Sequence, residues 1–70
     1  MTRQHCITRA ISVVDRLYNL SDEDRQVLKK RTVEAALGDN SALGHIIISS
    51  YDLENREMIG EILCLILPAD

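Results

Sequence analysis

The 70-residue sequence predicts an all-α fold, a small bundle of three to four short helices that is homodimeric through its C-terminal helix. Apolar residues recur at helical spacing near the N-terminus, and helix start and stop signals bracket residues 21–38. Six consecutive apolar residues follow at 62–67. A chain of this length lies near the lower size limit for independent folding, so we expect residues 1–70 to form one helical domain stabilised by association.

The first helix is expected from about Cys6 to Asn19, after a polar stretch, residues 1–5, that we expect to be frayed. Its apolar residues recur at offsets that place them on one face of a helix. They are Ile7, Ala10, Ile11, Val14, Leu17 and Tyr18. Because no glycine or proline interrupts this stripe, it predicts an amphipathic helix.

The second helix is expected to begin at Ser21 and to end at about Leu37. The Ser21 hydroxyl can accept a hydrogen bond from a backbone N–H, and the acidic residues 22–24 complement the positive end of the helix dipole. Gly38 supplies the left-handed conformation with which helices commonly stop. The expected core face consists of Val27, Leu28, Thr32, Ala35 and Ala36.

After a polar turn, a short segment runs from Ala42 to about Ser50, and its pattern fits two structures. Leu43, Ile46 and Ile47 fit a helical stripe, whereas the β-branched run Ile46–Ile48 also suits a strand. We favour a helix because no second segment with an alternating pattern is present to pair with a strand.

The final helix is expected to start near Asp52, an N-cap candidate, and to run to Leu67, where Pro68 stops it. Its second half, residues 62–67, is apolar all round the axis, whereas a surface helix has one apolar stripe. This run is either central in a four-helix monomer or shared with a second copy of the chain. We favour the second copy, because three short helices cannot easily enclose all of its sides. The expected dimer interface consists of Met58, Ile59, Ile62, Leu63, Leu65 and Ile66.

Charge is distributed unevenly along the chain, which has a net charge of −3. Residues 1–38 hold seven of the eight basic residues, and residues 39–70 hold six of the eleven acidic ones. The basic cluster on the second helix is a candidate contact for phosphates or for a partner protein, the alternative being a solvated face balanced by acidic neighbours. It consists of Arg25, Lys29, Lys30 and Arg31.

Acidic residues recur along one side of the final helix as Glu54, Glu57 and Glu61. They form a candidate face for a basic protein partner, and the alternative is again a solvated face. The chain has two tyrosines and no phenylalanine or tryptophan, so it lacks the aromatic platforms on which single-stranded nucleic acid stacks.

The sequence contains no catalytic motif, so we expect a non-enzymatic protein without metal or cofactor. His5, Cys6, His45 and Cys64 have the right chemistry for zinc, but their spacing does not fit a zinc motif. Both cysteines are expected to be reduced, buried thiols in a cytoplasmic protein. The N-terminus lacks the apolar run of a signal peptide, and no run approaches the roughly 20 apolar residues that span a membrane.

Several segments share a pattern with a known family. They are the helix start Ser21–Asp24, the turn Leu37–Asn40, the run His45–Ser49, the segment Asp52–Glu54, and the helix Met58–Leu67 with Ala69 and Asp70 after it. On these segments, residues 21–70 resemble the YmgB/AriR biofilm-development family of small enteric regulators. The chain departs from that family in a shorter segment between Ile48 and Asp52 and in a first helix without an evident match. The resemblance implies a helical, dimeric, non-enzymatic regulator that connects signalling proteins or acts on transcription.

The sequence therefore favours a small regulator that acts by protein–protein interaction, of connector or anti-regulator type, as a cytoplasmic helical homodimer. Its expected partners are a second copy of itself and a regulatory protein that the sequence does not identify. Two alternatives stay open: a DNA-associated transcriptional regulator that uses the basic helix face, and a small assembly or secretion chaperone. The DNA alternative predicts binding that falls steeply with salt.

Overall fold

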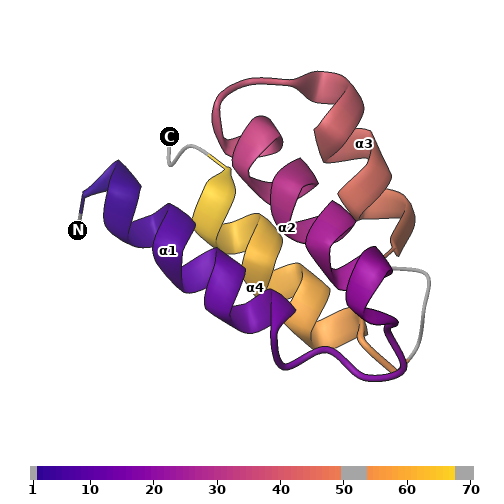
Figure 1. The fold of residues 1–70 in the computed structure, drawn as a ribbon. Coiled ribbons are helices and arrows are strands. Elements are labelled where there is room, and N and C mark those ends of the chain that lie inside the picture. Colours follow the sequence, from indigo (N-terminus) through magenta and orange to yellow (C-terminus); the bar gives the residue numbers. More distant parts are fainter. Residues whose placement is uncertain (1, 50–53, 68–70) are drawn as a thin grey trace.

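The computed structural model describes residues 2–49 and 54–67, and these residues form helices without any strand (Figure 1). This arrangement confirms the prediction of a small all-α bundle. The helices are α1 (Arg3–Val14), α2 (Asp22–Ala36), α3 (Asn40–Ser49) and α4 (Arg56–Ile66).

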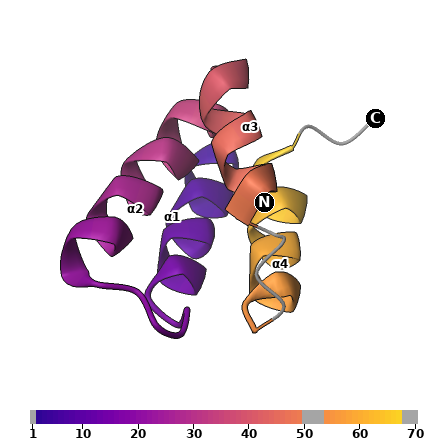
Figure 2. The same ribbon diagram turned by 90° about the vertical axis from the view of Figure 1, so that its right-hand side faces the viewer.

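Helices α1 and α4 lie side by side and run in opposite directions, while α2 packs between α1 and α3 (Figures 1 and 2). Helix α4 contacts each of the other three helices, whereas α3 packs against α2 and α4 only. The buried apolar residues other than Ala42 form one core cluster between the four helices. Its members are Ala10, Val13, Val14, Leu17, Leu28, Ala36, Ile46, Ile59, Ile62 and Ile66.

Helix α1 begins three residues before the predicted start. The Thr2 side chain accepts a hydrogen bond from the backbone N–H of His5 at 3.1 Å, and this N-cap orders residues 3–5, which were expected to be frayed. The helix ends at Val14, five residues before the predicted end, and Asn19 then adopts a left-handed conformation with φ of 57°. The prediction that Tyr18 belongs to the apolar stripe is wrong, because Tyr18 lies beyond the end of the helix and is exposed.

Helix α2 has the predicted start and stop. The Ser21 hydroxyl accepts from the backbone N–H of Asp24 at 3.1 Å, and Gly38 takes the left-handed conformation with φ of 106°. Leu28, Thr32 and Ala36 are buried as expected. Val27 lies outside the expected core face, since 42% of it is exposed.

The segment after the turn is helical, as favoured, and α3 begins at Asn40, two residues before the predicted start. The Asp39 carboxylate accepts hydrogen bonds from the backbone N–H groups of Ser41 at 2.9 Å and Ala42 at 3.2 Å, which stabilises this start. Ile46 is buried, but Ile47 was expected in the same stripe and is exposed.

Helix α4 begins at Arg56, and the predicted N-cap Asp52 lies outside the described residues. Asn55 stands at the N-cap, although its side chain is directed to another part of the chain. The backbone N–H of Tyr18 donates to Asn55 Oδ1 at 2.8 Å, and Asn55 Nδ2 donates to the Tyr18 carbonyl at 3.0 Å. This pair of bonds, here named the Asn55 clamp, ties the connection after α1 to the start of α4, and Asn55 is only 3% exposed.

We expect Asn55→Ala to lower the free energy of unfolding by about 2 kcal/mol, because both Tyr18 backbone groups lose a partner next to a buried position. Asn40→Ala is the matched control, since Asn40 is exposed, and its effect should stay within about 0.5 kcal/mol. Chemical denaturation followed by circular dichroism measures both. Equal effects of the two substitutions would contradict a structural role for the clamp.

Candidate functional site

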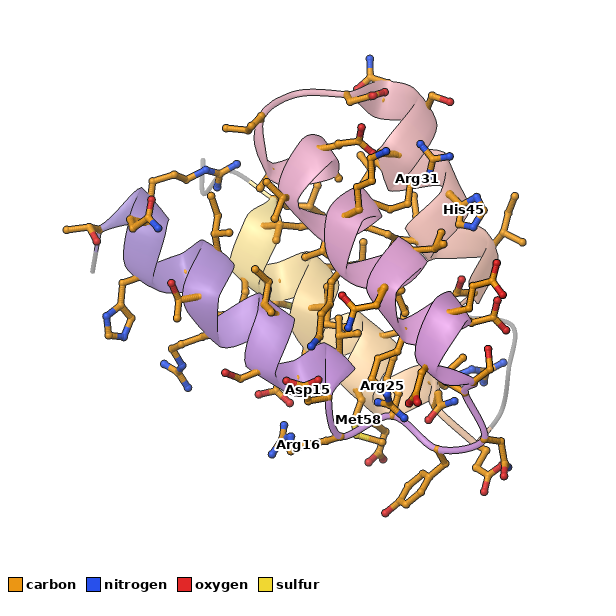
Figure 3. The ribbon with its side chains drawn as sticks, viewed as in Figure 1. Asp15, Arg16, Arg25, Arg31, His45 and Met58 are labelled. Atoms are coloured by element: carbon orange, nitrogen blue, oxygen red, sulfur yellow. The ribbon has the colours of Figure 1, made fainter. Side chains whose placement is uncertain are left out.

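The predicted basic cluster on α2 is used mainly for contacts inside the chain. The Arg25 guanidinium donates hydrogen bonds to the carbonyls of Val14 at 2.7 Å and Leu17 at 3.2 Å, so it caps the end of α1. Lys29 pairs with Asp15 at 2.6 Å. Figure 3 shows Asp15, Arg16 and Arg25 gathered around this end of α1.

The other two members of the cluster point elsewhere. Arg31 pairs with Glu34 at 3.3 Å, three residues along α2, and its Nε is buried without a hydrogen-bond partner in the described part of the chain. Lys30 is exposed. Arg25, Lys29, Lys30 and Arg31 therefore do not form a single surface on which phosphates could lie.

The predicted dimer interface on α4 needs correction for half of its residues. Ile59, Ile62 and Ile66 are buried in the core of the single chain, because α1, α2 and α3 together cover this face. A second copy cannot reach them in this fold. Met58, Leu63 and Leu65 are half-buried at the edge of the core. For these three residues the dimer interface stays a prediction.

Large apolar side chains are exposed on α3 and at the end of α4. Ile47 is 45% exposed, Ile48 68% and Leu67 46%. Leu63 and Leu67 lie one turn apart, on the flank of α4 opposite to Glu61, which pairs with Arg16 just beyond the end of α1. Ile47 likewise points away from His45, which lines a hollow shared with α2. We use the name apolar α3/α4 surface for the accessible apolar residues on these sides of the two helices, Ile47, Ile48, Leu63 and Leu67.

The predicted acidic face divides into separate contacts. Glu54 lies in the turn before α4 rather than on the helix, and it accepts a hydrogen bond from the Asn19 side chain. Glu61 pairs with Arg16, in the turn after α1, at 3.1 Å. Glu57 is exposed on α4. One of the three charges, that of Glu61, is therefore paired inside the chain.

A hollow of about 340 Å³ lies between α1 and α4 and was not expected from the sequence. Arg9, Ser12 and Val13 of α1 line it, together with Arg16 in the turn after α1 and Glu61 of α4. We name it the α1/α4 hollow. The only sequence signal for it is the spacing of Arg9, Ser12 and Arg16, which puts these three polar residues on one face of a helix. That spacing alone is also what any solvated helix face shows.

A smaller hollow of about 170 Å³ lies between α2 and α3. Three apolar and three polar residues line it. The lining residues are Leu20, Asp24, Val27, Leu28, His45 and Ser49. His45 is labelled at this side of the molecule in Figure 3.

Cys6 and Cys64 both lie among the described residues and form no disulfide bond; Cys6 is half-buried and Cys64 is exposed. The expectation of two buried thiols is thus wrong for Cys64, which lies on the outer side of α4. Residues 2–49 and 54–67 contain no group of three or more His, Cys, Asp or Glu side chains placed to hold a metal ion. No helix among these residues is long and apolar enough to cross a membrane.

Comparisons with protein-family models, curated proteins and solved structures gave no match to this chain. The resemblance to the YmgB/AriR family therefore stays a prediction. Two features of the described residues are candidates for function: the apolar α3/α4 surface and the α1/α4 hollow.

We expect Arg25→Ala to lower the free energy of unfolding by about 1–2 kcal/mol, because the carbonyls at the end of α1 lose a charged donor. Lys30→Ala is the matched control, because it removes the same charge from the exposed side of α2. Urea denaturation compares the two. If both substitutions have the same small effect, Arg25 does not cap α1.

Proposed function

We propose that this protein is a small non-enzymatic regulator that acts by binding other proteins and works as a homodimer. The observation that carries the proposal is the apolar α3/α4 surface. A solvent-facing helix normally carries charged residues on its outer side. Helix α3 contains no Asp, Glu, Lys or Arg in Asn40–Ser49, and it exposes Ile47 and Ile48.

A second copy of the chain is the occupant that suits this surface best. In an isologous interface the same patch of both copies meets, so like charges on that patch would repel each other. Helix α3 contains no Asp, Glu, Lys or Arg, so two copies of it meet without this repulsion. The surface includes Leu63, so it keeps one residue of the interface expected from the sequence. It lies on the flank of α4 away from α1, which leaves α1 and the α1/α4 hollow open in the dimer.

The regulatory part of the proposal agrees with the resemblance of residues 21–70 to the YmgB/AriR regulators. The nucleic-acid alternative gains no support, since Arg25, Lys29 and Arg31 are held by contacts inside the chain. The apolar α3/α4 surface also suits the second candidate function, a small assembly chaperone, whose apolar client helix would occupy it.

Sedimentation equilibrium of the purified chain tests the homodimer. We expect a mass twice that of one chain, and we expect the double variant Ile47→Glu, Ile48→Glu to raise the dissociation constant at least about a hundredfold, because two buried carboxylates would lack partners. Circular dichroism checks that the variant remains helical, since both residues are exposed in one chain.

Val27→Glu is the matched control, because Val27 is exposed to a similar extent, 42%, but lies on α2. It should leave the mass unchanged. A wild-type chain that is monomeric at every concentration would contradict the homodimer and favour the chaperone candidate. A double variant that stays dimeric would place the interface elsewhere.

A further inference from the structure

We infer that the α1/α4 hollow binds an acidic segment of a partner protein, with carboxylates seated on Arg9 and Arg16. The inference rests on the proposed function, since it takes the ligand to be a protein, and it adds the chemistry by which that ligand is recognised. Arg9 lies on α1, and Arg16 lies in the turn two residues beyond the end of the helix. Asp15 between them keeps the right-handed helical conformation, and its N–H still donates to the Ile11 carbonyl, so the two arginines are about 10 Å apart along the axis of α1. Ser12 and Val13 lie between them in the lining of the hollow.

The Arg9 guanidinium is available to a ligand, unlike those of Arg3 and Arg25. Arg3 donates to the Ala36 carbonyl, and Arg25 donates to the Val14 carbonyl at the end of α1, so both are occupied. The Arg9 side chain is exposed and makes no hydrogen bond or ion pair among residues 2–49 and 54–67. Arg9 can therefore accept a new carboxylate without giving up a contact.

Arg16 already shows the chemistry that it accepts. Its guanidinium pairs with the Glu61 carboxylate at 3.1 Å across the hollow, and the two side chains are 60% and 45% exposed. An ion pair this exposed stabilises a fold little, so a ligand carboxylate can replace Glu61 at small cost. Glu61 thus occupies the position that the carboxylate of the partner takes, and it weakens binding by competing for Arg16.

The spacing defines the complementary ligand. Two acidic residues seven positions apart on a helix lie about 10 Å apart along its axis, which matches the spacing of Arg9 and Arg16. An apolar residue midway between them faces Val13 in the hollow. Fork-shaped guanidinium groups bind carboxylates through two parallel hydrogen bonds, so this arrangement selects acidic over amide side chains.

Fluorescence anisotropy tests the inference with a labelled synthetic helix that carries glutamates seven residues apart and a leucine between them. Its counterpart has glutamine in both positions. We expect the chain to bind the glutamate peptide more tightly than the glutamine peptide. Arg9→Gln and Arg16→Gln should each weaken binding about tenfold. Arg56→Gln is the matched control, since it removes the same charge from an exposed residue outside the hollow.

Glu61→Gln gives a result that misfolding cannot imitate, because it should strengthen binding by freeing Arg16. Glu57→Gln removes the same charge one turn earlier on α4. It therefore controls for the change in electrostatic field that the loss of any negative charge on α4 would cause. We expect the gain to be larger for Glu61→Gln. The inference is overturned if Arg56→Gln weakens binding as much as Arg9→Gln and Arg16→Gln do, if the two glutamate variants behave alike, or if the peptides bind equally.

The double variant Ile47→Glu, Ile48→Glu separates this inference from the homodimer. The hollow is built from α1, the turn after it and α4 of one chain, so the variant should keep peptide affinity while it loses the dimer mass. Peptide binding without a wild-type dimer would refute only the homodimer. A wild-type dimer that binds neither peptide would refute only the role of the hollow.

Discussion

The burial of one face of α4 is the interaction on which the rest of the structure depends. Ile59, Ile62 and Ile66 are close to fully buried, and they are the residues around which α1, α2 and α3 all meet. A chain of 70 residues has few large apolar side chains to spare. Once these three are covered, Leu63 and Leu67 remain on the flank, and with the exposed isoleucines of α3 they form the surface to which we assign self-association.

Two arginine side chains cap the ends of neighbouring helices, a role that the distribution of charge along the sequence does not indicate. None of the four helices carries a basic residue in its last turn, where it would complement the negative end of the helix dipole. Arginines from neighbouring helices take this place: Arg25 of α2 caps the end of α1, and Arg3 of α1 reaches the Ala36 carbonyl at the end of α2. The two helices therefore hold each other by exchanging caps.

The sequence was sufficient for features that depend on neighbours in the chain. The start at Ser21 and the stop at Gly38 were predictable because the serine hydroxyl and the glycine backbone act within one helical turn. Which side of an apolar helix is covered is a property of packing, so half of the predicted α4 interface proved to be core. The capping of α1 by Arg25 was likewise not predictable from the sequence, because the carbonyls that it binds lie at the end of another helix.

The α1/α4 hollow could not be predicted for the same reason, since Glu61 joins Arg9 and Arg16 only after two distant helices pack. The Asn55 clamp was not predictable from the sequence either. A lone asparagine before a helix reads as an N-cap, and nothing nearby indicates that its amide will bind Tyr18, which is 37 positions away.

The clamp also has a consequence for how freely the molecule can vary. Asn55 binds main-chain atoms of Tyr18, so it fixes where the chain passes and not which side chain is carried there. The tyrosine ring itself is exposed. Proline, which has no N–H to donate, is the residue that the clamp excludes. Position 18 is thus a site at which a dye or a crosslinker can be attached without disturbing the bundle.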